Sequence, residues 1–139
     1  MNSDITAVDT SLAIPLLAQT HPDHARVIDW ASGRKLYLSG HAATEVYSVL
    51  TRLPGDMRLT PGQAATAIDR GFEGLLTLPE AVNSAIHHEL ARAMVAGGAA
   101  YDAVVALAAK ANGAVLATRD RRARPTYEAV GAEVVLVAV

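Results

Sequence analysis

The chain has 139 residues, of which 51% are hydrophobic and 19% are charged, so it has the size and composition of one globular domain. This composition excludes disordered, collagen-like and coiled-coil proteins. The chain contains no Cys, which excludes a disulfide scaffold, a thiolate nucleophile and a zinc ribbon, and we expect a cytoplasmic protein with no membrane segment. The formal net charge of -2 provides no overall attraction for nucleic acid, so any such binding must depend on a local basic patch.

Short apolar segments alternate with longer segments of helical periodicity along the whole chain. In chain order we predict a strand at 5–8, helices at 12–18 and 22–32, a strand at 35–39, helices at 42–52 and 61–72, a strand at 75–78, helices at 81–96 and 100–112, a strand at 114–118, a short helix within 121–130 and a strand at 133–137. This alternation predicts right-handed crossovers. We therefore expect one three-layer α/β/α domain over residues 1–139, with a central, mainly parallel five-stranded sheet.

Four acidic residues stand where this fold would bring them together. Asp9 follows the first predicted strand, and Asp120 follows the fourth, so both are expected at the carboxyl edge of the sheet, where ligands bind in open parallel sheets. Asp102 lies in a helix that is apolar on nearly all sides, and Glu45 lies at the margin of the apolar stripe of its own helix. The sequence thus predicts one acidic pocket made by these four side chains.

Four carboxylates in one pocket repel one another, and a bound cation removes this repulsion. Oxygen donors with no Cys and no paired His suit Mg²⁺ or Mn²⁺, and both ions bind phosphate oxygens well. The chemistry indicated is metal-assisted hydrolysis of a phosphodiester.

The chain resembles the PIN-domain ribonucleases, and within them the VapC toxins of bacterial VapBC toxin–antitoxin pairs. The resemblance spans essentially the whole chain and is carried by the segments Val8-Asp9-Thr10-Ser11, Glu45, Gly97-Gly98-Ala99-Ala100-Tyr101-Asp102 and Ala117-Thr118-Arg119-Asp120 in this order. One departure is that Arg121-Arg122-Ala123-Arg124 stands where the family commonly has an aromatic residue after the fourth acid.

The resemblance implies a PIN-like fold and an Mg²⁺- or Mn²⁺-dependent endoribonuclease that acts on RNA such as tRNA or rRNA. It implies that Asp9, Glu45, Asp102 and Asp120 are the catalytic acids, and we expect Asp9, Asp102 and Asp120 to hold the metal. We expect the hydroxyls of Thr10 and Thr118 to support these ligands. A small antitoxin is the implied partner, and a homodimer is the expected assembly.

Four arginines near the last acid form a local basic patch of the kind that the low net charge requires. Arg119, Arg121, Arg122 and Arg124 could steer RNA phosphates toward the acidic pocket, or could instead form a solvated loop or an antitoxin contact.

Each acid also has a structural interpretation. Asp9 could cap a helix, Glu45 could be solvated, Asp102 could complement a helix dipole, and Asp120 could cap a turn or pair with a neighbouring arginine.

Two other functions are alternatives to a ribonuclease for a chain of this size and fold class. One is a catalytically inactive PIN-like interaction module. The other is a phosphoacceptor receiver domain, which requires an Asp after the third strand and a Lys after the fifth, and the third strand here ends at Leu78-Pro79-Glu80.

Overall fold

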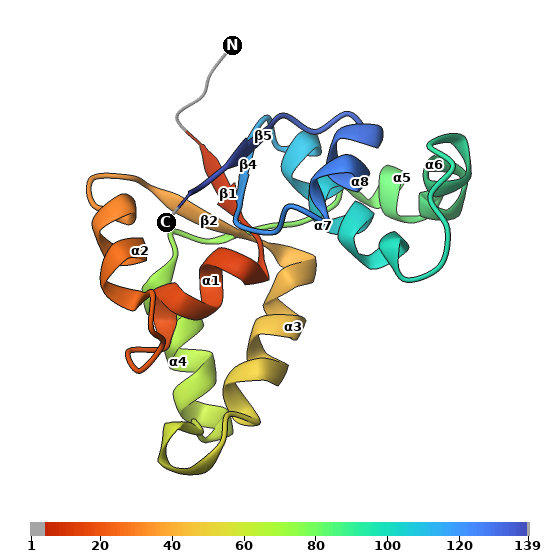
Figure 1. Ribbon diagram of the computed structural model, residues 1–139. Coiled ribbons are helices and arrows are strands. Elements are labelled where there is room, and N and C mark those ends of the chain that lie inside the picture. Colours follow the sequence, from red (N-terminus) through yellow and green to blue (C-terminus); the bar gives the residue numbers. More distant parts are fainter. Residues whose placement is uncertain (1–4, 139) are drawn as a thin grey trace.

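The computed structural model describes residues 5–138, so residues 1–4 and 139 of the expected domain lie outside the described residues. It contains a five-stranded sheet in which every neighbouring pair is parallel, in the order β3-β2-β1-β4-β5 (Figure 1). The strands are β1 (Thr6–Val8), β2 (Leu36–Ser39), β3 (Leu75–Leu76), β4 (Val115–Thr118) and β5 (Val134–Leu136). The predicted fold class is confirmed, and the sheet is wholly parallel.

The central strand β1 sets the register of the sheet. Its Val8 is opposite Leu38 on one side and Ala117 on the other, and all three side chains are buried. Small and branched apolar residues suit this position because helices cover both faces of a parallel sheet. The edge strands β3 and β5 are less protected, and Leu75 and Val135 are each 48% exposed.

Helices cover the sheet in two layers (Figure 1). The first layer contains α1 (Thr10–Leu17), α2 (His24–Ala31), α3 (Gly40–Thr51) and α4 (Pro61–Gly71), and the second contains α7 (Ala99–Ala111) and α8 (Arg124–Ala129). The short helices α5 (Glu80–Asn83) and α6 (Ile86–Arg92) lie beyond α7, away from the strands (Figure 1). A short 3-10 helix, Gly55–Met57, joins α3 to α4. None of the helices in residues 5–138 combines the length and apolarity needed to cross a bilayer.

The second layer contains the most buried helix of the molecule. In α7, Ala103 to Ala109 are all buried, which confirms the prediction that this helix is covered on most sides. Its first turn carries the acidic residue Asp102 to the carboxyl edge of the sheet. A half-buried acid at the beginning of an otherwise apolar helix indicates a role beyond packing.

The predicted helix 81–96 was wrong, because the structure divides this segment into α5 and α6. The break lies at Ser84 and Ala85, where the Ser84 hydroxyl donates to the carbonyl oxygen of Ala81 at 3.3 Å. A serine that bonds the local backbone in this way competes with the regular helix ladder. The helix after β1 also begins earlier than expected, at Thr10 instead of Leu12, because Asp9 caps it.

Candidate active site

A cavity of about 220 Å³ lies beside the carboxyl ends of β1 and β4. We call it the acid pocket, and it is lined by Asp9, Thr10, Ser11, Glu45, Asp102, Val105, Asp120 and Tyr127. The acids come from four places in the chain: the ends of β1 and β4, the second turn of α3 and the first turn of α7. The structure therefore brings all four predicted acids to one cavity.

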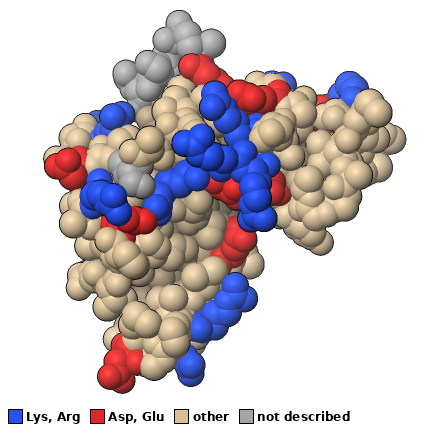
Figure 2. Space-filling model, in the orientation of Figure 1, with Lys and Arg blue, Asp and Glu red and all other residues tan. Residues whose placement is uncertain are grey.

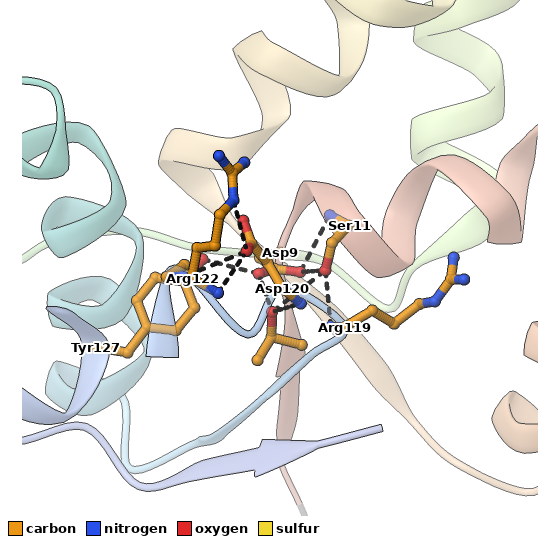
Figure 3. A network of polar contacts seen from close by, with 8 residues as sticks. Asp9, Ser11, Arg119, Asp120, Arg122 and Tyr127 are labelled. Carbon is orange, nitrogen blue, oxygen red and sulfur yellow. Dashed lines mark hydrogen bonds and ion pairs between the residues drawn. The ribbon is translucent and has the colours of Figure 1, made fainter. Parts of the chain in front are cut away.

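Asp9 is the most enclosed of these acids, with 3% of its surface exposed. One carboxylate oxygen, Oδ1, accepts hydrogen bonds from the backbone N–H and the hydroxyl of Ser11, at 3.1 and 2.6 Å. The other, Oδ2, accepts from the hydroxyls of Thr118 and Tyr127, the latter at 2.8 Å (Figure 3). The bond from the Ser11 N–H makes Asp9 the N-cap of α1, so the structural interpretation of this residue is correct alongside its place in the pocket.

Burial raises the pKa of the Asp9 carboxyl, and the hydrogen bonds from Ser11, Thr118 and Tyr127 act in the opposite direction. A buried carboxylate is costly unless its oxygens are hydrogen-bonded, and these donors supply that compensation. Asp9 is thus fixed in position by both folding and hydrogen bonding.

Asp102 lies in a different environment across the pocket. Partial burial raises its pKa first, and the negative charges of Asp120, Glu45 and Asp9 raise it further. No hydrogen bond to the Asp102 carboxylate is found among the described residues, so repulsion at this side chain is not offset by protein donors. The positive charge of Arg122 acts in the opposite direction but is the smallest of these influences, so the pKa of Asp102 stays raised, as expected within a cluster of acids.

Glu45 is exposed, yet it borders the pocket because Thr10 holds it there. The Thr10 hydroxyl donates to Oε1 of Glu45 across the space between α1 and α3. The Thr10 hydroxyl, which was predicted to support the site, therefore has a definite hydrogen-bond partner in Glu45. The second predicted hydroxyl, Thr118, is completely buried and donates to Asp9.

Asp120 begins the loop between β4 and α8 and also shapes it. Its Oδ1 accepts from the backbone N–H groups of Arg122 and Ala123, at 2.9 and 3.3 Å. The expected turn-capping role is therefore present. The guanidinium of Arg122 lies 3.8 Å from the same oxygen, and its side chain is 94% exposed.

The four arginines of this loop differ in their surroundings. Arg119 extends away from the carboxylates in Figure 3 and is ion-paired with Asp23, which precedes α2. Arg124 pairs with Glu128 at 3.3 Å within α8, whereas Arg121 and Arg122 are exposed. Figure 2 shows basic side chains crossing this face next to the central group of acids. The negative pocket is thus bordered by positive charge.

Sequence reasoning missed Ser11 and Tyr127 as parts of the pocket. Tyr127 shares the buried side of its short segment with Ala123 and Val130, and only 2% of its surface is exposed. A tyrosine on such a face needs a polar partner for its hydroxyl, and this was the available signal. The partner itself, Asp9, lies near the other end of the chain.

The oxygen-rich lining suits a hard divalent cation such as Mg²⁺ or Mn²⁺. Within residues 5–138 no three His, Cys, Asp or Glu side chains are already gathered closely enough to hold a metal ion. The fit therefore depends on the chemistry of the donors: several carboxylates on separate elements face one cavity, and burial together with repulsion by the other acids raises the pKa of Asp102.

The chain is similar to a known protein family and to proteins named as ribonucleases. The model of the PIN domain family matches residues 6–129. Ribonuclease VapC27 of Mycobacterium tuberculosis is 51% identical over 132 residues, which cover 95% of this chain and 96% of the relative. Ribonuclease VapC40 of the same species is 42% identical over 132 residues, covering 94% and 98% of the two chains.

Solved structures with the same fold include complexes. VapBC2 from Rickettsia felis, bound to a DNA fragment from its promoter, superposes with a TM-score of 0.65 at 12% identity, covering 96% of this chain and 99% of the other. FitAcB from Neisseria gonorrhoeae gives a TM-score of 0.62 at 20% identity, with coverage of 93% and 95%. At these identities the likeness concerns the fold.

Proposed function

The chain belongs to the PIN domain family, and from that premise we propose that it is a metal-dependent endoribonuclease toxin of the VapC type. The observation that carries the proposal is the acid pocket, in which four carboxylates face one cavity and the pKa of Asp102 is raised by burial and by the other three acids. Whole-length relatives named ribonucleases, at 51% and 42% identity, support RNA as the substrate.

In this proposal Asp9, Asp102 and Asp120 hold Mg²⁺ or Mn²⁺. The cation supplies Lewis-acid chemistry, which lowers the pKa of water and stabilises negative charge on phosphate oxygens. Glu45 is the proposed proton acceptor for the attacking water, because Thr10 fixes one of its oxygens at the pocket border. Ser11 and Thr118 keep the Asp9 carboxylate in one orientation.

The exposed arginines Arg121 and Arg122 are the proposed contacts to RNA phosphates at the border of the pocket. Arg119 and Arg124 are proposed as secondary RNA contacts, since each already has a carboxylate partner. This arrangement attracts the RNA backbone although the chain as a whole has a net charge of -2.

We propose a small antitoxin as the protein partner and a homodimer as the assembly. The structural neighbours described as VapBC and FitAcB support the partner, because they share the fold over nearly their whole length. Expression of the chain alone should arrest growth, and coexpression of the cognate antitoxin should restore it. Normal growth on strong expression of metal-loaded protein would contradict the toxin assignment.

The test of the catalytic proposal is cleavage of a panel of structured RNAs with Mn²⁺ or with EDTA. We expect metal-dependent internal cleavage, and a loss of at least about 100-fold in rate for Asp102→Asn. The matched control is Asp69→Asn, because Asp69 is an exposed acid in α4, outside the acid pocket. Absence of cleavage by the wild type under all conditions would favour the catalytically inactive PIN-like interaction module.

A further inference from the structure

The Asp9 carboxylate is fully engaged by protein donors. An ionised carboxylate offers about four lone-pair sites, two on each oxygen. In Asp9, Oδ1 accepts two hydrogen bonds from Ser11, and Oδ2 accepts one each from Thr118 and Tyr127. A cation that binds Asp9 directly must therefore displace a donor that is already present.

Two of the three hydroxyl donors are locked in place by the backbone. The backbone N–H of Arg119 donates to the Ser11 hydroxyl at 2.8 Å, and that of Asp120 donates to the Thr118 hydroxyl at 3.0 Å. Both hydroxyl oxygens also contact Asp9 and lie 3.2 Å from each other, so each of these two side chains is held by three contacts. The remaining donor on Oδ1, the Ser11 N–H, is fixed by the cap of α1.

Tyr127 is the exception. Within residues 5–138 its hydroxyl makes one hydrogen bond, to Oδ2 of Asp9 at 2.8 Å, and no backbone group donates to it. Its phenol also lines the acid pocket, whereas Thr118 lies behind Asp9 and does not line the cavity. Tyr127 is therefore the donor that faces the cavity and that has the fewest constraints.

We propose that Tyr127 competes with the divalent cation for Oδ2 of Asp9 and has to give up its hydrogen bond when the cation binds. This role rests on the proposed function, in which Asp9 is a metal ligand. The competition makes Tyr127 a positioning residue: its hydroxyl satisfies the buried carboxylate of the metal-free protein and lowers the affinity of the pocket for metal.

The test is calorimetric titration with Mn²⁺ of the wild type, Tyr127→Phe and Tyr47→Phe. Loss of a hydrogen bond to a charged group should tighten the Kd of Tyr127→Phe for Mn²⁺ by about tenfold. Tyr47→Phe is the matched control because this tyrosine of α3 lies outside the acid pocket, and its Kd should stay within about twofold of the wild type. An unchanged or weaker Kd in Tyr127→Phe overturns the proposal.

A second measurement follows the tyrosine directly. With ¹³C-labelled tyrosine, the ring-carbon resonance of Tyr127, assigned by its loss in Tyr127→Phe, should move as Mg²⁺ is added. Half of the shift should be reached at the Kd that a calorimetric titration of the wild type with Mg²⁺ gives. Retention of its metal-free position at saturating Mg²⁺ overturns the proposal even if the calorimetric values differ.

The two proposals can fail separately. If the wild type cleaves RNA with Mn²⁺ but Tyr127→Phe binds the ion no more tightly, the ribonuclease proposal stands and the competition is excluded. If no RNA is cleaved but Tyr127→Phe binds Mn²⁺ more tightly than the wild type, the competition stands and the ribonuclease proposal is excluded.

Discussion

The carboxylates on the two sides of the acid pocket differ in how far protein groups compensate their negative charge. On the side of the strand ends, Asp9 is buried and its oxygens are saturated by Ser11, Thr118 and Tyr127. On the side of the helices, Asp102 is half-buried, and the negative charges of Asp120, Glu45 and Asp9 add to the effect of burial in raising its pKa. The first carboxylate is explained by folding alone, whereas the second lowers stability unless a positive charge joins it. Asp102, whose carboxylate accepts no hydrogen bond from the described residues, is therefore the better indicator of a cation site.

The largest expected effect separates the two sides by stability in the absence of metal. Asp9→Ala should lower the free energy of unfolding by about 3 kcal/mol, because it removes a helix cap and leaves the buried hydroxyls of Thr118 and Tyr127 without their acceptor. Asp102→Asn should leave this free energy unchanged or raise it, because one repulsive charge is lost. Urea denaturation in EDTA measures both. Equal losses in the two variants would show that Asp102 has a structural role like that of Asp9.

The second prediction concerns the gain from metal. At a hundredfold excess of Mn²⁺ over its dissociation constant, the wild type should gain about 2.7 kcal/mol in unfolding free energy. Asp102→Asn should gain much less at the same Mn²⁺ concentration, because it lacks one proposed ligand. Asp69→Asn serves as the control and should gain as much as the wild type. Equal metal-induced gains in all three proteins would remove Asp102 from the cation site.

The fold and the convergence of the four acids could be predicted because they depend on local patterns. Apolar runs marked the strands, and the parallel connections placed Asp9 and Asp120 at the same edge of the sheet. The two acids on helices followed from helical periodicity, with Glu45 at the margin of an apolar stripe.

Features that depend on distant partners could not be predicted in this way. Tyr127 meets Asp9 across 118 positions of the chain, and Arg119 pairs with Asp23 across 96. Neither residue carries a local pattern that names its partner. The break between α5 and α6 was missed for another reason: it depends on a serine hydroxyl competing for a backbone carbonyl, which helical periodicity does not report.

The third prediction tests whether the positive border of the pocket binds RNA. Replacing Arg121 and Arg122 by Ala should weaken RNA binding across sequences, and each lost phosphate contact should reduce the salt slope by about 0.7 for single-stranded RNA. Arg119→Ala should have a smaller effect on this slope, because Asp23 already neutralises its guanidinium. Binding isotherms at several salt concentrations measure these slopes. A slope unaffected by the double variant would assign the two exposed arginines to the antitoxin or to solvent.

The smallest expected effect is the pH dependence of the helix side of the pocket. The pKa of Asp102 is raised above its ordinary value of 3.8, first by burial and then by its acidic neighbours, so the folded state binds this proton more readily than the unfolded state. The stability contributed by this site therefore rises as the pH falls toward 3.8 and is lost as the pH rises through the pKa of Asp102 in the folded state.

In metal-free protein, the wild type should gain unfolding free energy relative to Asp102→Asn as the pH is lowered from 7.5 to 4.5, by a small amount because the side chain is partly solvated. The lowered pKa of Asp23 acts in the opposite direction but is present in both proteins and cancels in their difference. Asp69→Asn should show a constant offset from the wild type over this range, and a constant offset for Asp102→Asn as well would mean that neither burial nor the neighbouring acids raise the pKa of Asp102.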